Sequence, residues 1–206
     1  MLSLRGLPIR AIRIILRPRY EWSVIKTDQS SRRILFRYVA LLTLPPIIAI
    51  TYPVYRDLLA YSNEPSVLRH AASYSLVVGF GWYLLNLVNV FIMGALFQSL
   101  FPVFAATEDR LRGLKIAAYA ETPLWMAITL TIIPYTIFDW ISLVALLYCF
   151  YLMFLAVVIL MDMPNKKAVW YTAATIFASG TIIIILDSSL ISVGDYLIKQ
   201  LWHHVV

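Results

Sequence analysis

Charged residues, cysteine and histidine are all scarce in this chain of 206 residues. Asp, Glu, Lys and Arg make up 14% of it, whereas soluble domains carry about 25%. The single cysteine, Cys149, excludes an intrachain disulfide, and three scattered histidines without a cysteine partner exclude a recognisable zinc site. We therefore expect neither a metal nor a cofactor, and the composition excludes a soluble globular protein.

Apolar residues are correspondingly abundant. They make up 61% of the chain, and the mean hydropathy is +0.79. Five apolar runs reach the length of about 20 residues that a helix needs to cross a bilayer. The runs cover residues 34–55, 72–101, 114–133, 140–160 and 168–186. The predicted fold is therefore all-α, a polytopic membrane protein with five transmembrane helices and an N-terminal amphipathic interfacial helix.

This reading divides the chain into three parts. Residues 1–33 form a cytoplasmic amphipathic leading segment, residues 34–190 form the five-helix transmembrane domain, and residues 191–206 form a short outward tail. Short loops leave no room for a water-soluble catalytic domain. The first apolar stretch is broken by Arg10 and Arg13 and lacks a cleavage site, so we expect no cleavable signal peptide.

The basic residues predict the orientation. Of the 17 Lys and Arg residues, fourteen lie in the leading segment, at the start of the first run, or ahead of the third and fifth runs. The other side carries only Arg56, Arg69 and Lys199. Because Lys and Arg near span ends are retained in the cytoplasm, the N-terminus is predicted to be cytoplasmic and the C-terminus outside. The net charge of +6 thus serves membrane placement and not nucleic-acid binding.

The leading segment contains a short helical pattern at residues 7–17. Arginines share one helical face, aliphatic residues occupy the opposite one, and Pro18 ends the helix. Such a helix can sink its apolar side into the headgroup layer and offer its cations to anionic lipid. Alternatively, it packs on the cytoplasmic end of the bundle. The predicted lipid-headgroup contacts are Arg10, Arg13, Arg17 and Arg19.

Glu121 is the clearest ionisable residue at membrane depth, and Thr122 and Pro123 follow it directly. A carboxyl group in hydrocarbon must be protonated, pair with a donor or face a wet cavity. Pro123 frees a backbone carbonyl near Tyr119, which predicts a kink or a pocket. The alternative is a structural carboxyl group that bonds a neighbouring span.

Other polar side chains complete a predicted intramembrane site. Asn86 and Asn89 share a helical stripe with Ser75 and Gly79, and this stripe should face inward. Tyr148 and Tyr151 share a face of the fourth run, where a phenol needs an acceptor. The predicted site comprises Glu121, Thr122, Pro123, Asn86, Asn89, Tyr148 and Tyr151.

Three segments carry a resemblance to a known family. They are RPRYEWSVIKTD at 17–28, KIAAYAETPLWM at 115–126 and LLYCFYLMFLAVVILMDMPNKKA at 146–168. They resemble the Yip domain family, the Ypt/Rab-interacting five-span membrane proteins. The resemblance implies five helices, a cytoplasmic N-terminus and, for a bacterial member, location in the inner membrane. Eukaryotic members act in vesicle traffic and bind prenylated Rab-type GTPases. Their long cytoplasmic region is absent here, so the chain is most similar to short bacterial members, for which the resemblance implies no catalytic residue.

Two functions follow from these observations. The leading hypothesis is a non-enzymatic membrane-organising or trafficking-type scaffold that contacts anionic lipid and self-associates. The alternative is a small transporter or ion pathway that uses Glu121 with Asn86 and Asn89. An intramembrane enzyme is not expected, because hydrolysis needs a nucleophile with a base, two carboxylates or a metal.

Overall fold

The computed structural model of this protein describes residues 7–28, 30–59, 65–100, 111–133 and 136–203. These residues form helices and no strand. Residues 1–6 of the predicted leading segment and residues 204–206 of the predicted tail lie outside this description. The helices are α1 (Leu7–Leu16), α2 (Pro18–Thr27), α3 (Arg32–Leu42), α4 (Leu44–Leu59), α5 (Pro65–Ser99), α6 (Arg112–Ala120), α7 (Thr122–Leu130), α8 (Thr136–Leu160) and α9 (Asn165–His203).

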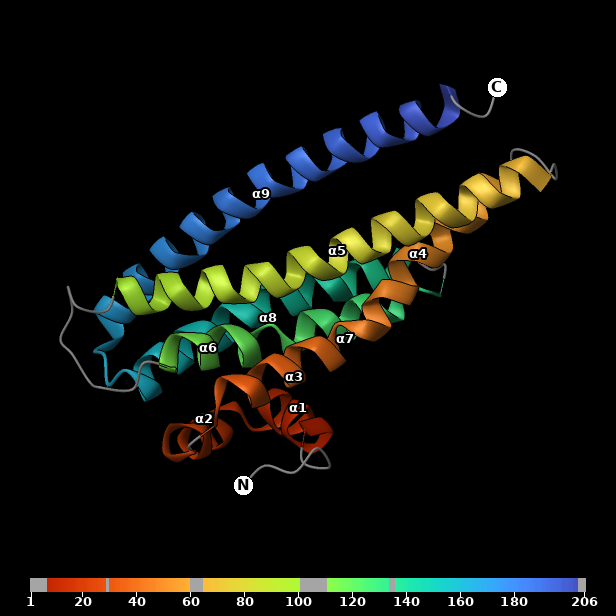
Figure 1. Ribbon diagram of the computed structural model, residues 1–206. Coiled ribbons are helices and arrows are strands. Elements are labelled where there is room, and N and C mark those ends of the chain that lie inside the picture. Colours follow the sequence, from red (N-terminus) through yellow and green to blue (C-terminus); the bar gives the residue numbers. More distant parts are fainter. Residues whose placement is uncertain (1–6, 29, 60–64, 101–110, 134–135, 204–206) are drawn as a thin grey trace.

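The long helices form a bundle, and the two N-terminal helices lie against its side. Figure 1 shows α3 and α4 following one another along the bundle toward the start of α5, while α6, α7 and α8 run alongside. Helix α9 lies close to α5 near the start of α9 and diverges from it toward the C-terminus. We call the end of the bundle where α5 ends and α6 and α9 begin the basic end, because Arg32, Arg112, Lys166 and Lys167 lie there.

Four helical segments are long and apolar enough to cross a membrane. They are Arg32–Pro53, Ala72–Ser99, Trp140–Leu160 and Asn165–Leu186, and they correspond to four of the five predicted runs. The third predicted run, 114–133, is not one continuous helix. It consists of α6 and α7, each nine residues long, which meet at Glu121. The predicted kink at Pro123 is therefore a break between two helices.

The first predicted run is interrupted as well. Thr43 separates α3 from α4, and its hydroxyl donates a hydrogen bond to the carbonyl of Val39 at 2.8 Å. Pro45 and Pro46 follow within the first turn of α4, where a missing N–H costs no helical bond. Pro53 lies inside α4. The paired prolines thus mark the start of the second segment.

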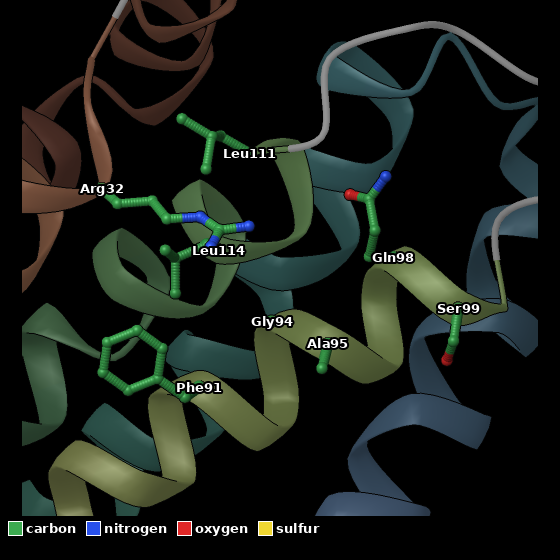
Figure 2. Close-up of a pocket in the computed structure, with 8 residues that line it drawn as sticks. All are labelled: Arg32, Phe91, Gly94, Ala95, Gln98, Ser99, Leu111 and Leu114. Atoms are coloured by element: carbon green, nitrogen blue, oxygen red, sulfur yellow. The ribbon is translucent and has the colours of Figure 1, made fainter.

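Two glycines bring α5 and α6 into close contact at the basic end. A Cβ atom on Gly113 would lie 2.3 Å from the carbonyl oxygen of Gly94 and 3.0 Å from the backbone nitrogen of Gln98. A Cβ atom on Gly94 would lie 2.9 Å from the Cα of Leu114. Figure 2 shows Gly94 where α5 passes the first turns of α6. Small residues allow this approach, as is common where membrane helices pack.

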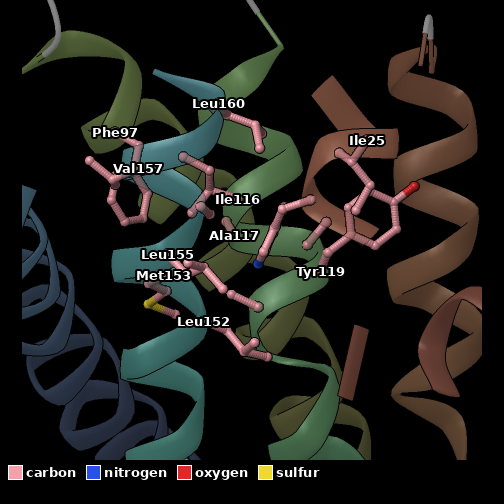
Figure 3. Close-up of a cluster of buried hydrophobic side chains, with 14 of the residues drawn as sticks. Ile25, Phe97, Ile116, Ala117, Tyr119, Leu152, Met153, Leu155, Val157 and Leu160 are labelled. Atoms are coloured by element: carbon pink, nitrogen blue, oxygen red, sulfur yellow. The ribbon is translucent and has the colours of Figure 1, made fainter. Parts of the chain in front are cut away.

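The core lies in the half of the bundle nearer the basic end. Figure 3 places α6 between α8 and the N-terminal helices, with Ile116 near Val157 and Leu160. These three side chains are fully buried, and Ile25 of α2 belongs to the same cluster. In contrast, the first half of α8 exposes a row of apolar side chains, which suits contact with lipid. This row comprises Ile137, Trp140, Ile141, Leu143, Val144 and Leu147.

Candidate functional site

The N-terminal hairpin, defined as residues 7–28, is held against the bundle at both of its ends. Pro18 occupies the first turn of α2 and separates it from α1. Near this corner, the Tyr148 hydroxyl donates a hydrogen bond to the carbonyl of Ile15 at 2.8 Å. At the far end of α2, Lys26 forms an ion pair with Asp162, which follows α8. Helix α2 therefore runs beside the second half of α8, and the hairpin is part of the folded bundle.

Arg10 lies at the centre of a buried charged cluster inside this hairpin. Its side chain is only 7% exposed. Its Nε lies 3.1 Å from Oε1 of Glu21, and its Nη1 lies 2.6 Å from Oδ2 of Asp28. Lys115 of α6 donates from Nζ to the backbone carbonyl of Asp28 at 2.7 Å. Two cations and two carboxylates thus meet where α1, α2 and α6 converge, so the buried charges compensate one another.

The cluster keeps both partners of its shortest ion pair charged. Burial alone raises the pKa of Asp28, but hydrogen bonds from Arg10 and Ser30 and the charges of Arg10 and Lys115 outweigh it and lower this pKa below 3.8. Burial alone lowers the pKa of Arg10. The hydrogen bond to Asp28 and the other interactions of the guanidinium group outweigh burial and raise this pKa above its ordinary value. The ion pair therefore persists at neutral pH.

Tyr119 of α6 contacts this cluster through both its hydroxyl and its ring. Arg10 donates from Nη1 to the Tyr119 hydroxyl at 3.2 Å, and its guanidinium carbon lies 5.4 Å from the ring centroid. Trp22 and Tyr38 contact the same ring edge-on, with centroid distances of 6.5 Å and 4.7 Å. Figure 3 shows Tyr119 pointing from α6 toward the N-terminal helices. One phenol ring therefore connects α1, α2 and α3 to α6.

Beyond Tyr119, the polar contacts continue at the break between α6 and α7. The Glu121 side chain is 5% exposed, and Asn89 donates to its Oε1 at 2.9 Å. The hydroxyls of Thr122 and Tyr38 are hydrogen-bonded to each other at 2.7 Å. One turn further on, the indole N–H of Trp125 donates to Oδ1 of Asn86 at 3.4 Å. Each polar side chain at the break thus has a partner on α3 or α5.

These contacts make the segment 115–126 the centre of the site. Lys115, Tyr119 and Thr122 follow one another at helical spacing and contact the hairpin or α3. Glu121 and Trp125 contact α5 instead. Two of the three segments that carry the family resemblance, 17–28 and 115–126, therefore meet directly through the Arg10 cluster.

The structure does not gather all the predicted intramembrane residues. Glu121, Thr122 and Pro123 are buried together, and Asn86 and Asn89 join them from α5. Tyr148 and Tyr151 stack on each other with a centroid distance of 5.7 Å, but the Tyr148 hydroxyl bonds the hairpin. Tyr148 thus contacts the hairpin, where its hydroxyl finds an acceptor, and Tyr151 contacts Tyr148.

The predicted headgroup contacts separate into two groups as well. Arg10 is buried, and its Nε and Nη1 atoms pair with Glu21 and Asp28 inside the protein, so the prediction that it contacts lipid headgroups is wrong. The side chains of Arg13, Arg17 and Arg19 are exposed. Apolar side chains of the same two helices are exposed as well. These are Ile9, Ile12, Leu16 and Tyr20, of which Leu16 is 73% exposed.

Sequence reasoning missed the acidic partners of Arg10. Glu21 and Asp28 are the only acidic residues of the leading segment, and that scarcity could have suggested a specific role. Helical spacing alone could not join Arg10 to Glu21, because Pro18 reverses the chain between them. Lys115 and Tyr119 lie in one of the segments that carry the family resemblance, 115–126. Their spacing alone does not indicate that they contact residues near the N-terminus.

The side chains of the site form ion pairs and hydrogen bonds that join the hairpin to α6. Among the described residues, no group of three or more His, Cys, Asp or Glu side chains could hold a metal ion. Two buried polar atoms of the hairpin, Oε2 of Glu21 and Nε1 of Trp22, have no hydrogen-bond partner in the described part of the chain. Both lie beside the Arg10 cluster, on α2.

The chain matches one known protein family over most of its length. The model of one family, the Yip1 domain, matches residues 12–186, from within α1 to within α9. The match includes residues 12–28 of the hairpin, the break at Glu121 and all four candidate spans. No curated protein and no solved structure matches the chain.

Proposed function

This chain belongs to the Yip1 domain family, and from that premise we propose that it is a non-enzymatic membrane-organising scaffold. In this proposal the bundle crosses the membrane, and the exposed arginines of the N-terminal hairpin contact anionic lipid from the cytoplasmic side. The observation that carries the proposal is the surface of the docked hairpin. Arg13, Arg17 and Arg19 are exposed among exposed apolar side chains, while the buried Arg10 cluster fixes the hairpin in place.

The mixture of exposed arginines and exposed apolar residues is what an interfacial surface requires. Aliphatic side chains such as Leu16 can enter the boundary between headgroups and acyl chains. Each nearby cation adds about 1 kcal/mol of attraction to an anionic leaflet. A surface in contact only with water would leave these apolar side chains hydrated at a cost. The docked hairpin therefore supports a lipid-contact role for the side of the protein that carries Arg13, Arg17 and Arg19.

The proposed topology has five crossings, with α6 and α7 together forming the third. Each of these helices has nine residues, and at 1.5 Å per residue the pair spans about 27 Å, close to the hydrocarbon thickness of about 30 Å. The break between them is acceptable at membrane depth because Glu121 and Thr122 bond side chains of α5 and α3. The N-terminus is then cytoplasmic and the C-terminus outside, as the basic residues predict.

Site-specific labelling tests this topology. In a background with Cys149→Ala, one variant carries a cysteine near Ser3 and another carries one near His204. We expect a membrane-impermeant maleimide to label intact bacterial cells or spheroplasts only at the C-terminal cysteine. Labelling of both ends from the same side would contradict five crossings.

The lipid contact is tested on the full protein in nanodiscs. In the Cys149→Ala background, Leu16→Cys is labelled with a dye that reports on polarity. We expect an apolar signal and protection from an aqueous quencher when phosphatidylglycerol is present, and loss of both in high salt or with Arg13→Gln, Arg17→Gln and Arg19→Gln combined. Lys166→Gln combined with Lys167→Gln removes exposed cations elsewhere at the basic end and serves as the control. A dye signal at this cysteine that is the same with and without phosphatidylglycerol in every variant would contradict the proposal.

Self-association is part of the proposed scaffold role. The exposed apolar faces of α8 and α9 provide surface that lipid or a second copy could cover. Light scattering of the purified protein in detergent, together with crosslinking in native membranes, measures the oligomeric state. A monomer under both conditions would remove self-association from the proposal.

A transport pathway through Glu121 is the alternative function. In its favour, Glu121 lies at a helix break within the predicted membrane region and bonds Asn89. Flux of protons or cations into liposomes, compared between the native protein and Glu121→Gln, separates the two functions. Flux that depends on this carboxyl group would favour the pathway, and flux that is absent or indifferent to the substitution favours the scaffold.

A further inference from the structure

A cavity opens at the basic end between α3, α5 and α6, away from the Arg10 cluster. Its volume is about 390 Å³, within the range of small-ligand sites. Figure 2 shows Arg32 reaching over it from α3, with Gln98 and Ser99 at the end of α5. The close approach of α5 and α6 at Gly94 forms its floor.

The cavity combines one cationic group with a mostly apolar wall. Arg32 brings a guanidinium group, and Gln98 brings an amide that can donate hydrogen bonds. Phe91 and Leu114 supply apolar surface on the opposing helices. Among the residues that the structure describes, none that lines the cavity is acidic. Its charge and hydrogen-bonding capacity therefore complement an anion that is attached to an apolar group.

The apolar wall continues onto the outer surface of the bundle. Phe36 lies one helical turn after Arg32, and its ring is 6.2 Å from the ring of Phe91. Both rings are exposed, Phe36 by 45% and Phe91 by 43%. They lie along α3 and α5 in the direction that leads from the basic end into the apolar part of both helices. An acyl chain that starts beside Arg32 can thus follow an aromatic surface into the bilayer.

We propose that this cavity binds one anionic glycerophospholipid of the cytoplasmic leaflet, with its phosphate on Arg32 and an acyl chain along Phe36 and Phe91. A guanidinium group forms paired, charge-assisted hydrogen bonds with phosphate oxygens. Basic pockets between membrane helices on the cytoplasmic side are suited to phospholipid headgroups. This site is separate from the hairpin surface, because its residues belong to α3, α5 and α6. It shares with the proposed function only the cytoplasmic placement of the basic end.

Native mass spectrometry of the full-length protein in detergent measures the binding. The protein is titrated with phosphatidylglycerol and with phosphatidylcholine, and the dissociation constant of the first bound lipid is determined for each. We expect phosphatidylglycerol to bind more tightly, and Arg32→Gln to weaken it roughly fivefold, the effect of one cation at a membrane surface. Arg33→Gln is the matched control, because Arg33 is the exposed neighbour that does not line the cavity.

A second variant tests the cavity without changing its charge. Ala95 lines the cavity, so Ala95→Phe fills it and should weaken both lipids. Ala174→Phe on the exposed face of α9 is its control. Thermal unfolding of each variant shows whether the bundle is intact.

Three results would overturn the proposal. Equal effects of Arg32→Gln and Arg33→Gln would indicate diffuse attraction, and unchanged binding in Ala95→Phe would place the lipid elsewhere. Competition by soluble glycerol 3-phosphate as effective as that by phosphatidylglycerol would indicate a free phosphate site. The hairpin variant with Arg13, Arg17 and Arg19 replaced should retain Arg32-dependent binding, so failure of the hairpin proposal and failure of this one are distinguishable.

Discussion

The hydroxyl of Tyr119 accepts a hydrogen bond from Arg10 across 109 residues of chain, and this contact joins the N-terminal hairpin to the helix that leads to the break at Glu121. The same guanidinium group pairs with Glu21 and Asp28 inside the hairpin. Arg10 therefore links the internal structure of the hairpin to its attachment on the bundle. A change at this residue should affect both.

Arg10→Gln should strongly destabilise the protein. The substitution leaves Glu21 and Asp28 buried or half-buried without their cation, and breaking a buried ion pair costs about 3–5 kcal/mol. Thermal unfolding in detergent, with Trp22 fluorescence as a local probe of the hairpin, measures the effect. Arg13→Gln is the control, because Arg13 is exposed and should change stability by less than about 0.5 kcal/mol. Equal effects of the two variants would contradict the cluster.

Asp28 should make stability depend on pH in acid. Its pKa is lower in the folded protein than the ordinary value of 3.8, so its stabilising contribution is complete above that value. The contribution is lost as the pH falls through the lowered pKa of folded Asp28. We expect Asp28→Asn to be less stable than the native protein at neutral pH and to approach it in acid. Unfolding midpoints measured between neutral pH and about pH 2 test this, and parallel curves for the two proteins would contradict it.

The bond between Asn89 and Glu121 should contribute modestly to stability. Interhelical side-chain bonds in membranes contribute about 0.6 kcal/mol on average. A double-mutant cycle with Asn89→Leu and Glu121→Leu should give a coupling energy of that order, measured by unfolding in mixed micelles. Glu121→Gln keeps an acceptor oxygen and should stay close to the native stability. A Glu121→Gln variant as unstable as Glu121→Leu would show that the carboxyl group itself is required.

Gly113→Ala should force α5 and α6 apart. The new Cβ would lie 2.3 Å from the backbone oxygen of Gly94, which cannot move without the helix, so we expect a loss of about 1–3 kcal/mol. Gly180→Ala is the matched control on α9, where a Cβ meets nothing within 4 Å. There the better helix propensity of alanine should stabilise by up to about 1 kcal/mol. Thermal unfolding of both variants checks the opposite signs.

The helical membrane class could be predicted from the sequence because it depends on local quantities. Apolar runs of sufficient length predicted the four helical segments that are long and apolar enough to cross a membrane, and the segments 17–28, 115–126 and 146–168 predicted the family. Inward-facing polar residues on α5 were predictable too, because Asn86 and Asn89 share one helical stripe. These features need only residue spacing and composition.

Long-range pairing could not be predicted in the same way. The partners of Arg10 depend on the reversal at Pro18 and on the position of α6, and helical spacing contains neither. The acceptor of the Tyr148 hydroxyl, the carbonyl of Ile15, lies 133 residues away in the chain, and helical spacing could not identify it either. Pro123 signalled a kink, but a complete break also needs partners for Glu121 and Thr122 on other helices, and only the folded structure supplies them.

The attachment of the hairpin also fixes an order of events during biosynthesis. Lys26 leaves the ribosome 136 residues before its partner Asp162, a delay of roughly 7 to 27 s at the usual rates of translation. Until α6 and α8 have been synthesised and inserted, the leading residues have no Tyr119, Tyr148 or Asp162 to bind. The hairpin therefore reaches its native position only after the chain has been synthesised as far as Asp162.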